Sequence, residues 1–232
     1  MFVNGEQPFL VYKTMSFSII ITAGGIGKRM QSNIPKQFLE VKGIPILMHT
    51  IRKFYEYDTT CQIILTLPED WLSYWKELIV KYNFNIVHEV VSGGVERYDS
   101  IKNALSYCDS DVIGVHDGVR PLVSHDTIKN CLVRIKEKGS VVPVIKFKES
   151  LRRIEQDGSR CLDRKDYVSV QTPQFFSSEI LIKSYEKAFH DKITDDASLV
   201  EESGFKISLV EGNEENIKIT TPFDLKIINL FV

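Results

Sequence analysis

A glycine-rich segment near the start of the chain could bind phosphate. Residues 22–30 read Thr-Ala-Gly-Gly-Ile-Gly-Lys-Arg-Met, and Pro-Lys-Gln-Phe follows at residues 35–38. Glycines let backbone N–H groups approach a phosphate closely, and Lys28, Arg29 and Lys36 add positive charge. The alternative is a tight strand-to-helix turn with surface lysines, which these residues alone leave open.

Two familiar phosphate-binding motifs do not match this segment. A P-loop requires serine or threonine after Gly-Lys, whereas Arg29 follows Gly27-Lys28 here. The dinucleotide fingerprint requires a third glycine at the position of Met30, and no acidic residue closes a second strand at the usual distance. The segment therefore indicates a phosphate site of another kind.

An acidic residue after a later apolar run could hold a metal ion. The segment His116-Asp117-Gly118-Val119-Arg120-Pro121 follows the run Val112–Val115. Mg²⁺ takes one or two protein carboxylates and completes its shell with phosphates and water, so Asp117 is the candidate ligand. A helix cap or a salt bridge to Arg120 is the alternative for Asp117. His116 lacks a second histidine at metal-ligand spacing and is predicted to be packed or hydrogen-bonded.

Alternating strand and helix patterns would position both segments. Apolar, β-branched runs predict strands at residues 17–22, 62–67, 86–91, 112–115 and 140–145. Helical periodicity predicts helices at residues 46–57, 69–82, 96–107 and 124–138, the last with Ser124 as its N-cap. Such repeats indicate an α/β domain with a Rossmann-like, mostly parallel sheet and helices on both faces. Ligands then bind beyond the carboxyl ends of the strands, where both candidate segments fall.

The order of elements argues against a metal-binding role for one further acidic motif. Asp109-Ser110-Asp111 has the DxD form of metal-dependent glycosyltransferases. It precedes the strand at residues 112–115, so it falls at the sheet edge opposite the expected site. A glycosyltransferase is therefore not favoured.

The alternation breaks between residues 146 and 168. Basic residues crowd this polar segment, which contains Asp157-Gly158, a dipeptide typical of hairpin turns. We interpret residues 147–168 as a two-stranded arm that projects from the domain, with a solvated loop as the alternative. An isolated hairpin is marginal in water, so a stable arm is expected to pack against a second subunit of a homodimer.

Composition and charge limit the possible partners and the cellular location of the chain. Its 232 residues, 43% hydrophobic and 26% charged, suit one domain at residues 16–232 after an N-terminal extension at residues 1–15. A formal net charge of −2 provides no global positive field for nucleic acid or an anionic membrane, and no apolar stretch is long enough to span a bilayer. Four cysteines without paired spacing, and a start unlike a secretory signal, predict a cytoplasmic protein.

Several separated motifs resemble the 2-C-methyl-D-erythritol 4-phosphate cytidylyltransferase family of the non-mevalonate isoprenoid pathway. In chain order they are AGGIGKRM, PKQFL, GGVERYDS at 93–100, HDGVRP, DRKDY at 163–167, QTPQFF at 171–176, ITDDAS at 193–198 and EGNEENIKITTPFDL at 211–225. Any one of them alone is weak, whereas the ordered set is specific. The resemblance implies a fold of the nucleotide-diphospho-sugar transferase type and CTP and a polyol phosphate as substrates. It also implies release of pyrophosphate and Mg²⁺ or another divalent cation as cofactor.

The resemblance also implies roles for individual residues. The reacting phosphate would be surrounded by Arg29, Lys36 and Lys218. Binding of CTP and its metal ion would fall to Ala23, Gly24, Gly25, Gly27, Gly94, Ser100 and Asp117, with Asp117 on Mg²⁺. The acceptor sugar phosphate would be bound by Arg120, Ser150, Arg164, Thr172 and Thr194, with Arg164 reaching across the dimer.

Two of these implied roles have purely structural alternatives. Lys218 lies in an apolar alternation and could be a strand-edge lysine that discourages aggregation. The Thr194-Asp195-Asp196 segment could be a helix N-cap with acidic first-turn residues. The resemblance favours the functional role for Lys218.

The chain departs from the family pattern at three positions. Val95 replaces a common aspartate, Gly118 a common alanine and Ser150 a common threonine. The first removes any polar contact made by the aspartate, and none removes a charged group from the proposed reaction centre. Two other functions stay open, namely a ribitol 5-phosphate cytidylyltransferase and a non-catalytic nucleotide-binding module. The motifs ITDDAS and DRKDY favour the methylerythritol enzymes.

Overall fold

The computed structural model describes residues 16–25 and 34–232. The predicted extension at residues 1–15 and two predicted site residues, Gly27 and Arg29, lie outside the described residues. Within the described ranges, the helices are all too short or too polar to cross a bilayer.

An eight-stranded sheet forms the centre of the domain, in the order β10-β7-β11-β6-β1-β4-β5, with β12 also paired to β7. Its strands are β1 (Phe17–Thr22), β4 (Gln62–Leu67), β5 (Glu89–Ser92), β6 (Val112–Asp117), β7 (Ser140–Lys146), β10 (Val168–Val170), β11 (Gln174–Ser177) and β12 (Ser208–Glu211). Strand β1 runs parallel to β4 and β6, β4 to β5, and β7 to β12. Strands β10 and β11 pair antiparallel with their neighbours. The predicted mostly parallel sheet is confirmed.

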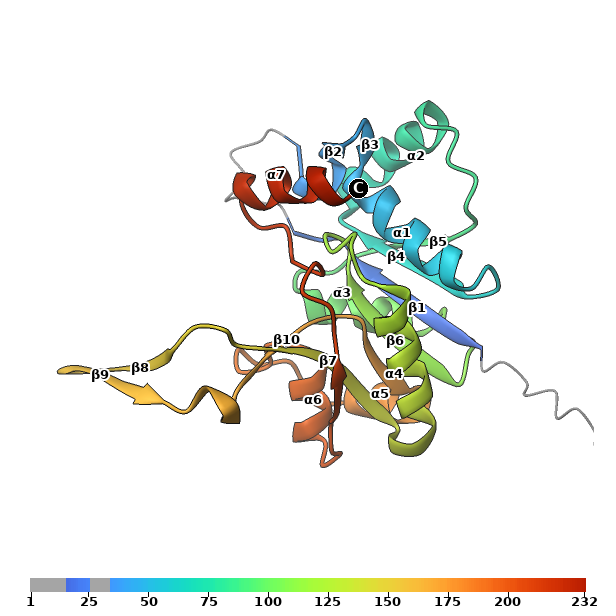
Figure 1. Cartoon of the computed structure of the whole chain (residues 1–232). Coiled ribbons are helices and arrows are strands. Elements are labelled where there is room, and N and C mark those ends of the chain that lie inside the picture. The colour runs from blue at the N-terminus through green and yellow to red at the C-terminus, as the bar shows by residue number, and fades with distance from the viewer. Residues whose placement is uncertain (1–15, 26–33) are drawn as a thin grey trace, which may run out of the picture.

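Helices cover both faces of the sheet (Figure 1). Helices α1 (Ile46–Tyr57), α2 (Leu72–Lys81) and α4 (His125–Lys138) contribute to one hydrophobic core. Helices α3 (Arg97–Leu105), α5 (Ser178–Ser184) and α6 (Asp196–Glu202) contribute to the other. Strand β1 explains the division, because Ile19 and Ile21 face the first core and Ile20 faces the second. All three are fully buried, as a strand covered on both faces requires.

Most predicted elements appear with small shifts at their ends. The bounds of β1, α1 and β4 match the prediction, and the Ser124 hydroxyl caps α4 by accepting from the Thr127 N–H at 3.0 Å. The helix expected at residues 69–82 opens with a 3-10 turn, η3 (Glu69–Trp71). The strand expected at residues 86–91 starts only at Glu89, since Val87 is 89% exposed and takes no part in the sheet.

The arm is a two-stranded hairpin, which confirms that prediction over the solvated loop. Strands β8 (Leu151–Glu155) and β9 (Gly158–Leu162) pair antiparallel, with Glu155 opposite Gly158. Gly158 has a φ of 136°, a backbone conformation that L side chains rarely adopt. A short 3-10 turn, η4 (Arg164–Asp166), leads back to the domain. Figure 1 shows the hairpin projecting away from the sheet, without packing on the rest of the described chain.

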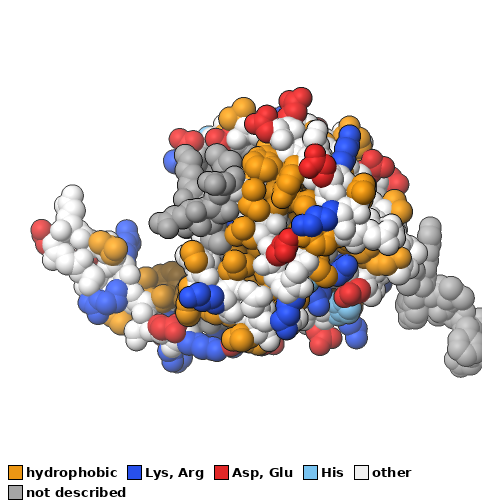
Figure 2. Space-filling view, turned by 90° about the horizontal axis from the view of Figure 1, so that it is seen from above, with side chains coloured by type: hydrophobic (Ala, Val, Ile, Leu, Met, Phe, Trp, Pro, Cys, Tyr) orange, Lys and Arg blue, Asp and Glu red, His pale blue; other side chains and the backbone are white. Residues whose placement is uncertain are grey.

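A small third core joins the C-terminus to the region after the glycine-rich segment. It contains Val41, Ile46, Val119, Ile219 and Ile228, from strand β2 (Glu40–Val41) through helix α7 (Pro222–Phe231). The region after the glycine-rich segment also includes the 3-10 turn η2 (Lys36–Phe38) and strand β3 (Ile44–Pro45). In the view from above, hydrophobic side chains gather on the upper face (Figure 2), where α7 exposes three large side chains, Phe223, Leu230 and Phe231.

Candidate active site

A cavity of about 360 Å³ opens at the carboxyl ends of β1, β5 and β6. Eight residues predicted for the site line it together, namely Ala23, Gly24, Gly25, Lys36, Gly94, Ser100, Asp117 and Lys218. They come from five separated stretches of sequence. The parallel sheet brings these stretches to one edge, as expected for an α/β fold.

The glycine turn is held from two sides. The Ala23 N–H donates to the Thr66 carbonyl at 3.0 Å, and the buried side-chain amide of Gln37 donates to the Ala23 carbonyl at 2.6 Å. These bonds tie the end of β1 to β4 and to the turn η2. The side chain of Lys36 is thereby carried to the same cavity as Gly24 and Gly25. No role for Gln37 was predicted, although it stands beside Lys36 in the PKQF motif.

A second glycine pair packs closely on the start of α3. The Gly94 N–H donates to the Ser100 hydroxyl at 3.0 Å, and that hydroxyl donates to the Glu96 carbonyl at 3.1 Å. A Cβ atom at Gly94 would lie 2.2 Å from the Cβ of Asp99, so a side chain cannot fit there. The close approach fixes the cavity wall formed by Gly94 and Ser100. Val95, which replaces the common aspartate, also lines the cavity.

Two cations hold the Asp117 carboxylate at the end of β6. Arg120 Nε lies 2.9 Å from its Oδ2, and Lys218 Nζ lies 3.2 Å from its Oδ1. Burial raises the pKa of Asp117, but the charges of Lys218, Arg97 and Arg120 outweigh it and hold the pKa well below its usual range. The carboxylate is therefore ionised at neutral pH. The salt bridge to Arg120 that was considered as an alternative is present, alongside the contact with Lys218.

Buried polar groups fix the backbone behind Asp117. The Thr172 hydroxyl accepts from the Asp117 N–H at 3.1 Å and lies 2.9 Å from Nδ1 of His116. Nε2 of His116 lies 3.1 Å from the Arg120 carbonyl, which can only accept, so Nε2 is the donor of this bond. Burial lowers the pKa of His116 to about 4. The predicted packed, hydrogen-bonded histidine is confirmed.

The C-terminal segment reaches the cavity through a backbone anchor. The Ile219 N–H donates to the Val119 carbonyl at 3.0 Å, and Lys36 Nζ donates to the Ile219 carbonyl at 2.9 Å. Lys218 is thus placed next to Asp117, with 43% of its side chain exposed. The strand-edge alternative for Lys218 is wrong, because its segment belongs to no strand of the described sheet.

Arg120 and Thr172 lie behind the cavity wall. Arg120 also donates from Nη1 to the Asn216 carbonyl at 2.7 Å, while the Asn216 side chain donates to the Thr172 carbonyl at 2.8 Å. Asn216 is fully buried and was not predicted. It stands two residues before Lys218 in the same apolar alternation, which does not indicate its distant partners, so only the fold reveals that it links the two predicted acceptor residues.

Three predicted acceptor residues lie away from this cavity. Thr194 lines a neighbouring cavity of about 220 Å³, and the N-cap of α6 is Asp195 rather than Thr194. The Asp195 side chain accepts from the Ser198 N–H at 2.9 Å and forms a capping box with it. Ser150 and Arg164 are exposed at the base of the arm, where Arg164 contacts the Lys148 carbonyl. Within a single chain, Ser150 and Arg164 do not line the cavity.

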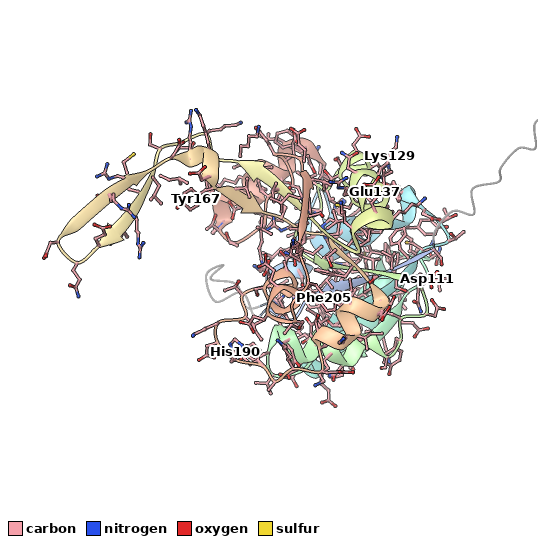
Figure 3. The ribbon with its side chains drawn as sticks, turned by 90° about the horizontal axis from the view of Figure 1, so that it is seen from below. Asp111, Lys129, Glu137, Tyr167, His190 and Phe205 are labelled. Atoms are coloured by element: carbon pink, nitrogen blue, oxygen red, sulfur yellow. The ribbon has the colours of Figure 1, made fainter. Side chains whose placement is uncertain are left out.

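The acidic DxD motif lies elsewhere, as predicted. Figure 3 labels Asp111 on the side of the domain away from the arm and Tyr167 close to the arm. Asp111 immediately precedes β6, whereas Asp117 ends that strand. The motif therefore faces the edge of the sheet opposite the cavity.

Arg97 is a further cation of the cavity that was not predicted. The lining residues within the described ranges include three cations, Lys36, Arg97 and Lys218, and two carboxylates, Glu96 and Asp117. The arginine lies in the GGVERYDS motif, where a cation beside two glycines could have been recognised. No group of three metal-binding side chains occurs within residues 16–25 and 34–232.

Comparisons with known proteins point to one family. The family model for 2-C-methyl-D-erythritol 4-phosphate cytidylyltransferase matches residues 17–232. A protein of that description from Phocaeicola vulgatus is 47% identical over 219 residues, which cover 94% of this chain and 100% of that protein. One from Clostridium botulinum is 39% identical over 215 residues, covering 90% and 93%.

Solved structures of similar proteins share the fold. The 4-diphosphocytidyl-2C-methyl-D-erythritol synthase from Anaerococcus prevotii has a TM-score of 0.79 at 29% identity, covering 94% of this chain and 96% of that chain. The Francisella tularensis 2-C-methyl-D-erythritol 4-phosphate cytidylyltransferase has a TM-score of 0.78 at 29% identity, covering 94% and 100%. The chain therefore belongs to the 2-C-methyl-D-erythritol 4-phosphate cytidylyltransferase family.

Proposed function

We propose that the cavity at the carboxyl edge of the sheet is where this chain transfers CMP from CTP to 2-C-methyl-D-erythritol 4-phosphate. The products are 4-diphosphocytidyl-2-C-methyl-D-erythritol and pyrophosphate, in non-mevalonate isoprenoid precursor synthesis. One observation carries the assignment to this cavity: Lys36, Asp117 and Lys218, which are far apart in sequence, surround one space.

The reaction requires two anions to meet. A phosphate oxygen of the acceptor attacks the α-phosphorus of CTP, a new P–O bond forms, and the bond to the β-phosphate breaks so that pyrophosphate leaves with the electron pair. The attacking monoester has its second pKa near ~6 and is already ionised at neutral pH. Positioning and charge stabilisation are then the main demands, and no strong general base is needed.

The cavity residues are suited to those demands. Backbone groups of Ala23, Gly24 and Gly25 would lie against the CTP phosphates, because glycines let the backbone approach closely. Lys36 and Lys218 would neutralise the charge that grows on the α-phosphate as pyrophosphate leaves. Their ammonium groups are fixed in advance by the Ile219 carbonyl and the Asp117 carboxylate. Preorganised charges of this kind need little rearrangement during the reaction.

Asp117 fits a role as ligand of Mg²⁺ or another divalent cation. Its low pKa keeps the carboxylate charged, and one carboxylate suffices for Mg²⁺ when phosphate oxygens and water supply the other ligands. The bound ion would neutralise triphosphate charge. Lys218 Nζ lies 3.2 Å from the same carboxylate, so Asp117 would provide the counter-charge for both the ammonium group and the ion.

Acceptor binding combines residues from one chain and from a second subunit. Arg120, Thr172 and Thr194 would act in the same chain, with the first two also holding Asp117 in place. Arg164 and Ser150 would reach the partner's site from the exposed base of the arm, which makes the active form a homodimer. We further assign the protein to the cytoplasm, with no nucleic-acid or membrane partner.

Pyrophosphate release in a coupled assay tests the function. CTP with 2-C-methyl-D-erythritol 4-phosphate is expected to give turnover that EDTA abolishes and excess Mg²⁺ restores. Ribitol 5-phosphate and other nucleoside triphosphates serve as comparison substrates in the same assay. Faster turnover of ribitol 5-phosphate would overturn the acceptor assignment, and no pyrophosphate with any pair would leave only a nucleotide-binding module.

A further inference from the structure

A buried ion pair joins α3 to α6 next to the proposed active site. Arg97 Nη2 lies 2.6 Å from Asp196 Oδ2. The Asp196 side chain has no exposed surface, and its other oxygen accepts from the Tyr185 hydroxyl at 2.6 Å. Both carboxylate oxygens are therefore occupied, and the proposed mechanism has given neither residue of the pair a role.

The aromatic residues behind this pair make it rigid. The Tyr185 ring stacks on that of Tyr98, with centroids 4.8 Å apart and an angle of 21° between the planes. The Tyr98 hydroxyl donates to the Tyr185 carbonyl at 3.0 Å. Tyr98 is the residue after Arg97, so both ends of the pair are fixed to the same aromatic stack. The guanidinium of Arg97 is thus held in place before any ligand binds.

Arg97 lies between two cavities. It lines the cavity that contains Lys36, Asp117 and Lys218, and also the smaller cavity that contains Thr194. One third of its side chain, 33%, is exposed, in contrast to the fully buried Asp196. The ion pair therefore presents one fixed cation to the boundary between the proposed nucleotide and acceptor residues.

The start of α3 has other means of stabilisation. The side chain of Glu96 and that of Asp99 form a capping box there, and the Tyr98 hydroxyl ties the helix to the residues after α5. A buried ion pair must overcome the cost of removing both charges from water, and neutral replacements of similar shape are often as stable. Stability alone is thus a weak reason for a buried pair at this boundary.

We propose that Arg97 is a further substrate-binding residue of the transfer reaction, whose guanidinium binds a phosphate oxygen of CTP or of the acceptor. Asp196 and Tyr185 are its positioning residues and act through it. This inference rests on the proposed function and, among the residues that the structure describes, adds a third cation to Lys36 and Lys218. Arginine suits the task because its planar fork binds phosphate while another of its nitrogens stays on a carboxylate.

The decisive variant removes the charge without stranding its partner. In the full-length double variant Arg97→Gln with Asp196→Asn, both members of the buried pair become neutral; asparagine has the shape of aspartate, and glutamine keeps the first part of the arginine stem and an amide donor. We expect kcat/KM to fall about tenfold to hundredfold, the range for loss of one charge-assisted hydrogen bond, with little change in melting temperature. Arg134→Gln is the matched control, because Arg134 pairs with Glu137 on the exposed face of α4 and should leave turnover unchanged.

The KM values identify which phosphate is bound. If Arg97 binds the acceptor, the KM for 2-C-methyl-D-erythritol 4-phosphate rises while calorimetric CTP affinity stays at the wild-type value. If it binds the nucleotide, CTP affinity falls without acceptor present. The positioning variant Tyr185→Phe keeps the aromatic stack and should raise the KM of the same substrate several-fold, whereas a purely structural role would lower the melting temperature and leave both KM values unchanged.

Two different failures can be told apart. If the wild type releases pyrophosphate but the double variant matches it in both KM values, in kcat and in CTP affinity, the role of Arg97 is overturned and the proposed function stands. If the wild type shows no turnover with any substrate pair, the proposed function itself fails. Arg97→Lys provides a rescue test, since it should recover part of the lost affinity by retaining the charge.

Discussion

Charged residues are buried at the cavity edge, meaning the carboxyl end of the sheet around Asp117, and exposed on the arm. At the cavity, Asp117 is buried and contacts Arg120 and Lys218 within the same chain. Along β8 and β9 nearly every side chain is exposed, including Ile154 at 89%. The contacts of the cavity residues can therefore be read from one chain, whereas those of the arm depend on what packs against it.

This difference explains where one chain suffices to assign a role. A buried carboxylate between fixed cations keeps its geometry because leaving it unpaired would be costly. A two-stranded ribbon has no core of its own and is marginally stable in water. Charge at the sheet edge can thus be assigned within one subunit, whereas the role of charge on the arm rests on the proposed contact with a second subunit.

The largest expected effect comes from the cavity edge. We expect Lys218→Ala to lower kcat about a hundredfold to a thousandfold, as for the loss of one preorganised charge in a transition state, and Lys36→Ala to behave alike. Steady-state pyrophosphate release measures the effect, and an unchanged circular dichroism spectrum shows that the fold is kept. Lys129→Ala, on the exposed face of α4, is the control. Near-normal turnover of Lys218→Ala would contradict the assignment of the reaction to this cavity.

A second prediction for the cavity edge concerns stability: we expect His116 to make the free energy of unfolding depend on pH. The folded pKa of His116 is about 4 against 6.5 for the free side chain, so protonation favours the unfolded state. This contribution is fully present above the unfolded pKa and is lost as pH falls from 6.5 towards 4. Between about pH 8 and about pH 5, the free energy of unfolding of the wild type should fall by about 2 kcal/mol more than that of His116→Gln.

Urea unfolding at a series of pH values measures this difference. Glutamine can accept from the Thr172 hydroxyl and donate to the Arg120 carbonyl without titrating, which makes it the matched replacement. Parallel pH curves for the two proteins would show that His116 does not cause the effect. Arm variants should keep the wild-type curve, since the arm has no buried titratable group among its described residues.

Subunit mixing tests the role assigned to the arm. Arg164→Ala alone should lower kcat/KM for the acceptor about tenfold to hundredfold, as a charge-assisted contact is lost. If Arg164 serves the partner's site, a mixed dimer of Arg164→Ala and Lys218→Ala has one intact site. Equal mixing after dissociation should then regain about a quarter of wild-type activity, because half of the dimers are mixed. No regain in verified mixed dimers would place Arg164 in its own subunit's site or outside both.

The smallest effect should come from the surface of the arm. Arg160 Nε lies 3.3 Å from Glu155 Oε1, and both side chains are about half exposed. Water screens such pairs, so Arg160→Ala should change the free energy of unfolding by less than about 0.5 kcal/mol. Chemical denaturation provides the measurement. A loss above about 1 kcal/mol would indicate that Arg160 is buried in the proposed dimer, unlike in the single chain.

Local patterns predicted many individual elements correctly. The apolar run of β1, the periodicity of α1 and the Ser124 cap each depend on neighbouring residues, and all appear as predicted. The Asp157-Gly158 turn likewise depends on local backbone preference. The N-cap of α6 lies within the Thr194-Asp195-Asp196 segment that was the alternative to an acceptor site; all three residue types are good caps, and only packing selects Asp195.

By itself, the sequence determined the parallel sheet, the strand ends that carry Gly24 and Asp117, and the ordered motifs of the family. Those features follow from short-range periodicity and residue type. Only the tertiary structure decided that β11 inserts between β6 and β7, that Lys218 contacts Asp117 without belonging to a strand, and that Arg97 pairs with Asp196. These contacts join residues about a hundred positions apart or strands out of chain order, and no local pattern encodes which distant partner gives the lowest free energy.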